Sequence, residues 1–478
     1  MTKKKLSTSK VLAFASADLF GGGSFNIVNF LYPGFLALTV GIPVYWVGVI
    51  TLTARIWDAI TDPIMGIISD RTNTKLGKRR IYLIVASPLV VLGLFLLFYP
   101  FSFASLALRI VASLFTYLFF TTVQTMVMIP YYSLSSEISS DYQERARANT
   151  YRLGFSIFSS ILCVALPGMI VDMFKAEDGS KAPGFIIMSL IFGIIFGVSV
   201  LLTGLFAKEE IITAPIKTKI TFKNFIQPLK LKTYRQYLWI FITVQITMAV
   251  MSGLFFFYID FYICRDLTQS GVSNHVGLIG AALMFFMQIV ALPIYLSLIK
   301  KKDKMYVYRL GSYIWILSAL LLFILPPNAN EIIVYLVAVV IGFGISGPGL
   351  IPHTIFGDVV DSSELVFKER KEGTISGLTN FANKTAQAIG LSLAMMLIGA
   401  FGFIEAEIGT VVYEQPLSAQ MALKAIISFA PLIFVTIGVI ISKKYKINYA
   451  MQQRIVKALE ERASGYEDIK LVEEIQNA

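Results

Sequence analysis

The chain has 478 residues, of which 56% are hydrophobic and only 15% are charged. Soluble globular domains carry about a quarter charged residues, so this composition excludes an ordinary soluble protein and indicates an integral membrane protein. The formal net charge of +11 does not point to a nucleic-acid partner, because the basic residues form short clusters between apolar runs and not a folded basic surface.

Apolar windows long enough to cross a bilayer recur along the whole chain. A span needs about 20 predominantly apolar residues in a helix, because lipid satisfies no backbone hydrogen bond. The first window follows several lysines, but its length and the lack of a small-residue cleavage site favour a retained helix over a signal peptide. In chain order, the predicted spans are 11–38, 43–69, 81–100, 105–135, 150–172, 184–206, 236–263, 276–299, 306–326, 331–357, 373–403 and 419–442.

We therefore predict an all-α polytopic membrane protein with twelve transmembrane helices in two six-helix bundles. A long connection at 207–235 separates an N-terminal bundle at 1–206 from a C-terminal bundle at 236–442. This division is typical of transporters whose site lies at the midplane between two halves, although an accidental loop in another twelve-helix architecture is an alternative. The tail at 443–478 alternates charged and apolar residues at helical spacing, which favours a solvated or membrane-surface helix.

The distribution of lysine and arginine predicts the orientation in the membrane. If the N-terminus is cytoplasmic, most of the 41 basic residues fall in cytoplasmic segments, as the positive-inside rule requires. We therefore expect a multi-pass monomer in the cell (inner or plasma) membrane, with both termini in the cytoplasm.

Ionisable residues within the predicted spans are the strongest functional signal. Each costs roughly 2.5–3.5 kcal/mol at the centre of a span, so each is a candidate functional residue whose partner has to be found. Six stand out, namely Asp18, Arg55, Asp58, Asp62, Arg152 and Lys384.

Two of these residues form a candidate cation site. Arg55, Asp58 and Asp62 share one face of the second predicted helix. Two carboxylates one turn apart offer the oxygen ligands that a hard cation prefers, and the cation relieves their mutual repulsion. Thr61 adds a hydroxyl nearby. Without a metal cation one carboxylate would take up a proton, so H⁺ coupling stays open, and a structural ion pair between Arg55 and Asp58 is the alternative reading.

Lys384 lies in the eleventh predicted helix on a polar face with Asn380, Asn383 and Gln387. It could reach the carboxylates of the second helix across the interface between the halves and act as a tethered positive charge when the cation is absent. A purely structural salt bridge between the halves is the alternative.

Polar and aromatic residues of three further helices predict a cavity for a polyhydroxylated ligand. Aromatic faces stack on the apolar side of a sugar ring, and charged groups hydrogen-bond its hydroxyls. These residues are Asp18, Gly21, Gly22, Gly23, Ser24, Asn26 and Asn29 in the first helix, Gln124, Thr125, Tyr131 and Tyr132 in the fourth, and Arg152 and Ser156 in the fifth.

Three long segments, in matching order, resemble the glycoside-pentoside-hexuronide:cation symporter family, the melibiose permease-like branch of the major facilitator superfamily. They read RIWDAITDPIMGIISDRTNTKLGKRR from Arg55, IPYYSLSSEISSDYQERARANTYRLGF from Ile129, and GDVVDSSELVFKERKEGTISGLTNFANKTAQAIG from Gly357. The resemblance covers essentially the whole chain and implies the major facilitator superfamily fold.

The resemblance implies roles for individual residues. Asp58 and Asp62 would bind the coupling cation, which is Na⁺ if the protein is sodium-coupled, with Thr61 and Thr125 beside it. Asp18 and Arg152 match sugar-contacting residues, Lys384 matches a lysine near both sites, and Gln124 and Asn26 are further candidates for substrate binding.

One departure from the family affects the substrate. The family's sugar-binding aspartate of the fourth helix is Met128 here, and its downstream tryptophan is Tyr132. Losing a carboxylate while keeping Arg152 makes the cavity more positive, so we expect an anionic sugar such as a uronide or a sulfonated sugar, with Arg152 as its charge partner.

Charged residues near the cytoplasmic ends of the helices are candidates for a gate, in which ion pairs hold the halves shut on that side. A solvated positive-inside loop is the alternative for some of them. The gating candidates are Asp70, Arg71, Arg79, Arg80, Glu137, Arg145, Asp358, Asp361 and Arg370.

The predicted function is secondary active transport, in which Na⁺ or H⁺ is coupled to symport of a sugar or sugar derivative by alternating access. The sequence contains no P-loop, ABC-type nucleotide motif or nucleophile elbow, so we expect neither an enzyme nor a cofactor beyond the coupling ion. Two alternatives stay open: the same fold transporting a lipid or another organic anion, and a membrane sensor that does not transport.

Overall fold

The computed structural model describes residues 6–139, 142–177, 179–207, 226–265, 272–369, 372–405, 414–463 and 469–476. All regular structure in these ranges is helical. The first half contains α1 (Thr8–Ser16), α2 (Asp18–Leu38), α3 (Val44–Arg71), α4 (Arg80–Leu97), α5 (Leu106–Glu137), α6 (Tyr142–Met173) and α7 (Ala182–Phe206). The second half contains η1 (Gln227–Lys230), α9 (Lys232–Tyr258), η2 (Ile259–Ile263), α10 (Val272–Lys301), α11 (Lys304–Ile324), α12 (Glu331–Phe367), α13 (Glu372–Ala400) and α14 (Leu417–Lys444), followed by α15 (Tyr449–Ala463) and α16 (Ile469–Gln476).

These helices confirm the predicted twelve-span architecture. Within the described ranges, ten spans are long and apolar enough to cross a membrane, with α1 and α2 counted as one. The two remaining long helices, α3 and α13, carry the charged and amide residues that lower their hydropathy. Most boundaries agree within a few residues, but α6 begins at Tyr142 rather than at 150, and α12 continues to Phe367 rather than ending at 357. Both extensions are polar helical turns, which a search for apolar windows does not detect.

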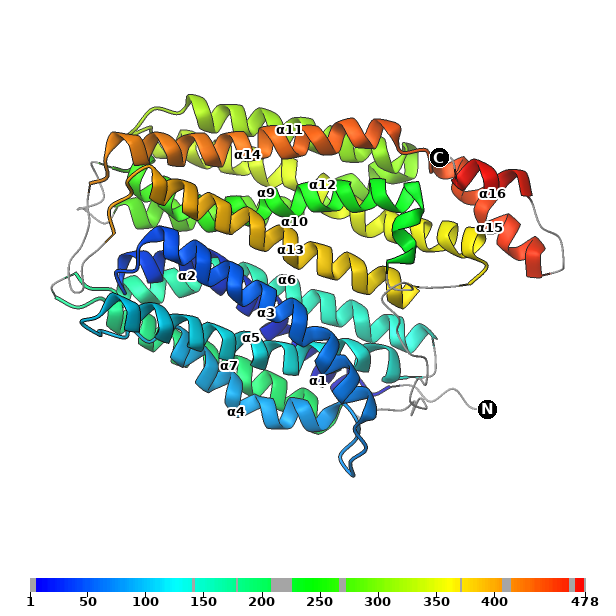
Figure 1. Ribbon diagram of the computed structural model, residues 1–478, viewed down its shortest axis with the longest axis horizontal. Coiled ribbons are helices and arrows are strands. Elements are labelled where there is room, and N and C mark those ends of the chain that lie inside the picture. Colours follow the sequence, from blue (N-terminus) through cyan, green and yellow to red (C-terminus); the bar gives the residue numbers. More distant parts are fainter. Residues whose placement is uncertain are drawn as a thin grey trace.

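The helices form two halves that lie side by side (Figure 1). Helices α1 to α7 pack together in one half, and α9 to α14 pack together in the other. We call the end of the molecule at which α1 begins and α14 ends the terminal end, and the opposite end, where residues 39–43 connect α2 to α3, the distal end. Most of the predicted middle connection, residues 208–225, lies outside the described residues.

The two halves meet closely at the distal end. Here the start of α3 packs against the end of α13, and Gly48 and Gly399 let the two backbones approach: a Cβ atom on Gly48 would lie 2.8 Å from the carbonyl oxygen of Ser392. The carboxylate of Glu405, in the second half, accepts a hydrogen bond of 2.9 Å from the backbone nitrogen of Val44 in the first half. This set of contacts, which we call the distal seal, closes the molecule at that end.

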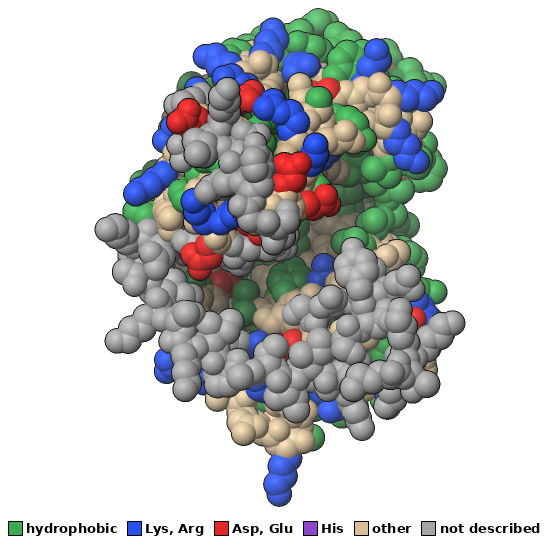
Figure 2. Space-filling model, turned by 90° about the vertical axis from the view of Figure 1, so that its right-hand side faces the viewer, with side chains coloured by type: hydrophobic (Ala, Val, Ile, Leu, Met, Phe, Trp, Pro, Cys, Tyr) green, Lys and Arg blue, Asp and Glu red, His purple; other side chains and the backbone are tan. Residues whose placement is uncertain are grey.

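The terminal end is different, because a hollow separates the halves there (Figure 2). Lys, Arg, Asp and Glu side chains gather over this face. The tail helices α15 and α16 pack on the second half, against α12 and α9, through the buried side chains of Met451, Ile455, Leu471 and Ile475. The molecule is therefore sealed at the distal end and open at the terminal end.

Candidate ion and substrate site

A cluster of two carboxylates, a hydroxyl and a lysine joins the two halves in the middle of the molecule. Nζ of Lys384, on α13, lies 2.9 Å from Oδ2 of Asp58 on α3 and also donates to Oδ2 of Asp62. Oγ1 of Thr125, on α5, lies 2.9 Å from Oδ1 of each aspartate. We call these four residues the carboxylate–lysine cluster, and it brings together three helices whose residues are far apart in sequence.

The cluster is buried but not sealed. The side chain of Asp58 is 5% exposed, whereas those of Asp62 and Lys384 are 19% and 27% exposed. Polar atoms inside a bundle with this exposure face a cavity or the opening between the halves, so an ion could reach them from the hollow at the terminal end.

Two neighbours on α3 do not take the places that the spacing suggested. The hydroxyl of Thr61 donates to the backbone carbonyl of Asp58 at 3.2 Å, and among the described residues it makes no hydrogen bond to a side chain of the cluster. Arg55 does not pair with Asp58 as the alternative reading required, because its Nη2 donates to Oδ1 of Asn29 on α2 at 2.8 Å. Lys384 therefore supplies the positive charge beside Asp58, and that alternative is wrong.

A second cluster lies near the start of α2. Nε of Arg152, on α6, is 3.5 Å from Oδ2 of Asp18, and the guanidinium also lies over the ring of Tyr132, 5.5 Å from its centroid. Met128 packs beside them, since a Cβ atom on Gly21 would meet both Asp18 and the end of the Met128 side chain. The charge of Arg152, which we expected to face an anionic substrate, is thus already matched by a carboxylate.

Gln124 and Asn26 are engaged with neighbouring helix groups. Nε2 of Gln124 donates to Oγ of Ser24 at 3.3 Å, which ties α5 to α2. Asn26 is buried, and its amide donates to the backbone carbonyl of Gly22 on its own helix at 3.2 Å.

Three of the gating candidates of the first half have partners within that half. Nη2 of Arg79 lies 3.2 Å from Oε1 of Glu137, and both side chains are buried. Arg80 donates through Nε to the backbone carbonyl of Gly204 at 2.8 Å, and Arg71 is exposed. The side chains of Asp70 and Arg145 lie outside the described residues, as does Arg370.

The gating candidates of the second half also have partners within their own half. Oδ2 of Asp358 lies 2.6 Å from Nζ of Lys304, and Oδ2 of Asp361 accepts a hydrogen bond of 3.0 Å from Gln452 of α15. These pairings fit a molecule that is open at the terminal end.

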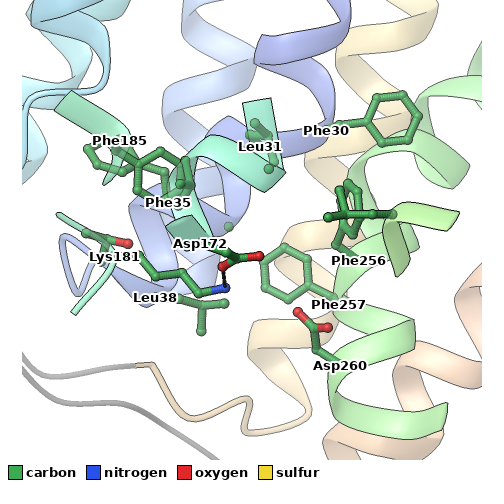
Figure 3. A pocket seen from close by; sticks show the side chains of 15 residues that line it. Phe30, Leu31, Phe35, Leu38, Asp172, Lys181, Phe185, Phe256, Phe257 and Asp260 are labelled. Carbon is green, nitrogen blue, oxygen red and sulfur yellow. Dashed lines mark ion pairs between the residues drawn. The ribbon is translucent and has the colours of Figure 1, made fainter. Parts of the chain in front are cut away.

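A pocket at the distal end lies between the two halves (Figure 3). Aromatic side chains such as Phe30 and Phe256 line much of it, and an ion pair of 3.1 Å joins Asp172 to Lys181 at its edge. Asp260 points toward this ion pair from the second half. The pocket lies within the closed end of the molecule, apart from the carboxylate–lysine cluster.

Sequence reasoning did not identify Glu405 as a contact between the halves. Its carboxylate supplies the cap that α3 lacks, because Pro43 at the N-cap position offers no side-chain hydrogen bond. The proline before a helix start is a signal that a cap must come from elsewhere, but nothing in the sequence says from which segment.

Comparisons with known proteins agree with this architecture. The sequence profile of the MFS/sugar transport protein family matches residues 13–449. The sodium-dependent lysophosphatidylcholine symporter 1-B of Danio rerio is 23% identical over 98% of this chain and 92% of its own length. The isoprimeverose transporter of Lactiplantibacillus pentosus is 26% identical over 84% of this chain and 82% of its own length.

A solved structure supports the same fold. A bacterial homologue of the human lysosomal transporter Spinster, in an inward-facing and unoccupied conformation, superimposes with a TM-score of 0.66 at 12% identity, covering 95% of this chain and 98% of that one. The profile match, the two helical halves and the charged cluster between them together lead to one assignment: the chain belongs to the MFS/sugar transport protein family and is a secondary transporter of the symporter type, not an enzyme.

Proposed function

We propose that this transporter couples the entry of Na⁺ or H⁺ to the uptake of a sugar or sugar derivative across the cell membrane. The observation that carries the proposal is the carboxylate–lysine cluster, in which Asp58 and Asp62 of one half share Lys384 of the other. With the positive-inside orientation, the terminal end faces the cytoplasm and the molecule is open inward.

The geometry of Thr125 supports a bound cation or proton at this cluster. A hydroxyl has one proton to donate, yet Oγ1 lies 2.9 Å from an oxygen of Asp58 and 2.9 Å from an oxygen of Asp62. The hydroxyl can donate fully to one oxygen or share its proton between both. A proton on one carboxyl group or a cation between the oxygens would strengthen this arrangement, and Na⁺ and H⁺ can each act in this way.

Lys384 acts in this mechanism as a stand-in for the coupling ion. Its ammonium group compensates the two carboxylates when the site holds no cation, and it ties α13 to α3. An arriving cation competes for the same oxygens and releases the lysine, so ion binding changes a contact between the halves. A ligand shifts a conformational equilibrium only through such a difference between states.

The cluster of Asp18, Arg152 and Tyr132 supports a sugar as substrate. A carboxylate and a guanidinium offer hydrogen bonds to hydroxyl groups, and the half-exposed Tyr132 ring offers a stacking face. The name of the isoprimeverose transporter among the relatives agrees with a sugar. The name of the lysophosphatidylcholine symporter favours a lipid as the second candidate substrate.

The test is uptake into proteoliposomes of a panel of labelled glycosides, pentosides, uronides and a lysophospholipid, with and without a Na⁺ gradient at fixed pH, and then with a pH gradient alone. We expect a cation gradient to drive accumulation of a sugar. Asp58→Asn should abolish accumulation, whereas the control Asp172→Asn at the distal pocket should retain it. Accumulation by Asp58→Asn equal to that of the wild type would show that the ion site is wrong. Binding without counterflow of any compound would instead indicate a sensor.

A further inference from the structure

Arg55 is a buried cation without an acidic partner. It is 9% exposed, and no carboxylate lies within ion-pair distance of it among the residues that the structure describes. Its guanidinium donates one hydrogen bond, to Asn29, and lies 5.7 Å from the centroid of the Phe25 ring. An amide oxygen and a ring face orient the charge but do not neutralise it.

The other ionisable residues that stand out inside the predicted spans differ from Arg55, because each of them has a partner of opposite charge. Arg152 is matched by Asp18, and Lys384 lies between Asp58 and Asp62. The group of Asp58, Asp62 and Lys384 carries one net negative charge, which balances the charge of Arg55 at a distance. A coupling cation bound at Asp58 and Asp62 cancels that negative charge. This group and the cation together with Arg55 then carry one net positive charge in a low-dielectric environment, and within the described part of the chain Arg55 has no carboxylate of its own to offset its charge.

An uncompensated buried charge is strongly unfavourable, so a ligand that supplies the opposite charge binds well once the cation is in place. A guanidinium has five N–H donors in a planar fork and binds carboxylate, sulfonate or phosphate groups through two parallel hydrogen bonds. Among the described residues, Arg55 uses one of these donors, on Asn29. The remaining donors suit an acidic group on a substrate.

The position of Arg55 also separates it from the sugar-ring residues. Its partner Asn29 lies eleven positions after Asp18 on α2, which corresponds to about 16 Å along the helix axis. Side chains shorten this gap, but a substrate that reaches both places is longer than a single sugar ring. An aryl glucuronide meets this requirement, because its ring carboxylate can lie at Arg55 while its aryl group extends toward Tyr132.

We propose that Arg55, rather than Arg152, selects an acidic glycoside by binding its carboxylate after the cation has bound. This inference rests on the proposed symport function. It adds the charge of the substrate and the residue that recognises this charge. Cation and acidic substrate then neutralise each other within the protein, so each raises the affinity for the other.

The experiment compares two probes of the same shape, 4-nitrophenyl β-D-glucuronide and 4-nitrophenyl β-D-glucoside, which differ in a carboxylate and a hydroxymethyl group. Binding to the purified full-length protein is measured by calorimetry at saturating Na⁺ and, separately, at low pH without Na⁺. We expect the wild type to bind the glucuronide about tenfold or more tighter than the glucoside. Arg55→Gln should lose this preference while its glucoside affinity changes little, and Arg55→Lys should keep part of it.

Arg152→Gln is the matched control, because it removes the same charge at a position already paired with Asp18. It should weaken the binding of both probes without changing the ratio of their affinities. Retained glucoside binding shows that Arg55→Gln is folded, and a thermal unfolding curve checks this independently. The inference is wrong if Arg55→Gln keeps the wild-type ratio, if Arg152→Gln removes it, or if the wild type binds neither probe or prefers the glucoside.

Failure of this inference and failure of the proposed function give different results. Na⁺- or H⁺-driven accumulation of the glucoside with no preference for the glucuronide would leave symport intact and exclude the role of Arg55. Tight glucuronide binding that needs Arg55 but is independent of both Na⁺ and pH would support Arg55 and exclude the coupling at Asp58 and Asp62.

Discussion

The two ends of the molecule are held in different ways. At the distal end the halves touch through backbone and small side chains: Gly399 lies against Tyr45 of α3, and Thr51 meets Ser392 with their hydroxyl oxygens 3.3 Å apart. At the terminal end ion pairs join charged side chains, such as Arg79 with Glu137 in the first half and Lys304 with Asp358 in the second.

This difference shows which interactions have to change during transport. Close packing depends on atomic fit and is lost within a small displacement, whereas ion pairs can be exchanged between partners. Opening the distal end must break the distal seal, and closing the terminal end brings the charged ends of the two halves together, where pairs such as Lys304 with Asp358 can exchange partners. The carboxylate–lysine cluster lies between the two ends and contacts both halves, so the ion that binds there can influence both.

The largest effect is expected from removing the lysine of the cluster. Lys384→Met leaves Asp58 and Asp62 without a fixed positive charge, and breaking a buried pair in this way is strongly destabilising. Because Lys384 is partly exposed, we expect a loss of up to about 3 kcal/mol in the absence of a cation. Na⁺ should restore most of this loss, since it takes the place of the lysine. Thermal unfolding of the purified protein with and without Na⁺ measures both quantities.

The matched control for Lys384 is at the terminal end. Lys304→Met also removes a lysine from a carboxylate, Asp358, at 2.6 Å, but this pair lies in one half and outside the cluster. Its loss of stability should be the same with and without Na⁺. If Na⁺ stabilised the wild type and Lys384→Met equally, the lysine would not compete with the cation.

The second largest effect is expected at the distal seal. In Gly48→Ala the new Cβ atom would lie 2.8 Å from the carbonyl oxygen of Ser392, and a backbone atom cannot move aside as a side chain can. Overpacking of this kind costs typically about 1–3 kcal/mol. We expect the halves to separate at the distal end and the population open at that end to rise roughly tenfold or more.

Distances between spin labels at two exposed distal positions, Phe103 and Leu417, one in each half, measure this change. Gly34→Ala is the control, because nothing lies within 4 Å of the Cβ atom that it adds on α2. An unchanged distance distribution in Gly48→Ala would mean that the distal seal tolerates a methyl group and does not limit opening.

A smaller effect is expected from Glu405→Gln. The carboxylate of Glu405 accepts from the backbone nitrogen of Val44 at the start of α3, where the helix dipole favours a negative charge. Glutamine keeps an acceptor but removes the charge, which should cost about 1 kcal/mol and shift the same label distances by a population change of about fivefold.

Glu331→Gln is the matched control for this cap. Glu331 is also an acid in the first turn of a helix that begins at the distal end. It belongs to that helix, α12, whereas Glu405 contacts a helix of the opposite half. Its substitution should leave the label distances unchanged. Equal shifts in both variants would assign the effect to distal surface charge and not to the contact between the halves.

The sequence predicted the parts of this molecule that depend on local physics. Apolar windows predict spans because a bilayer imposes length and hydropathy on each segment separately, and the charges at Asp58, Asp62 and Lys384 stand out for the same reason. The choice of partners was not predictable, because Arg55 had an acid one turn away and an amide on another helix within reach. The link from Glu405 to Val44 depends likewise on how the halves pack, which no single segment encodes.

The smallest effect is expected where the tail contacts the terminal end. Gln452→Ala removes the 3.0 Å hydrogen bond to Asp361, but it also removes Oε1 of Gln452, a buried acceptor without a described partner. A hydrogen bond to a charged group and an unsatisfied buried acceptor are of similar magnitude and opposite sign, so the unfolding free energy should change by less than about 1 kcal/mol. Thermal unfolding and proteolysis of the tail measure the change. A loss well above that value would mean that this one bond holds α15 on α12. A small change would instead place the docking energy in the buried side chains of Met451 and Ile455, so that the bond between Gln452 and Asp361 can be lost without undocking the tail when the terminal end closes.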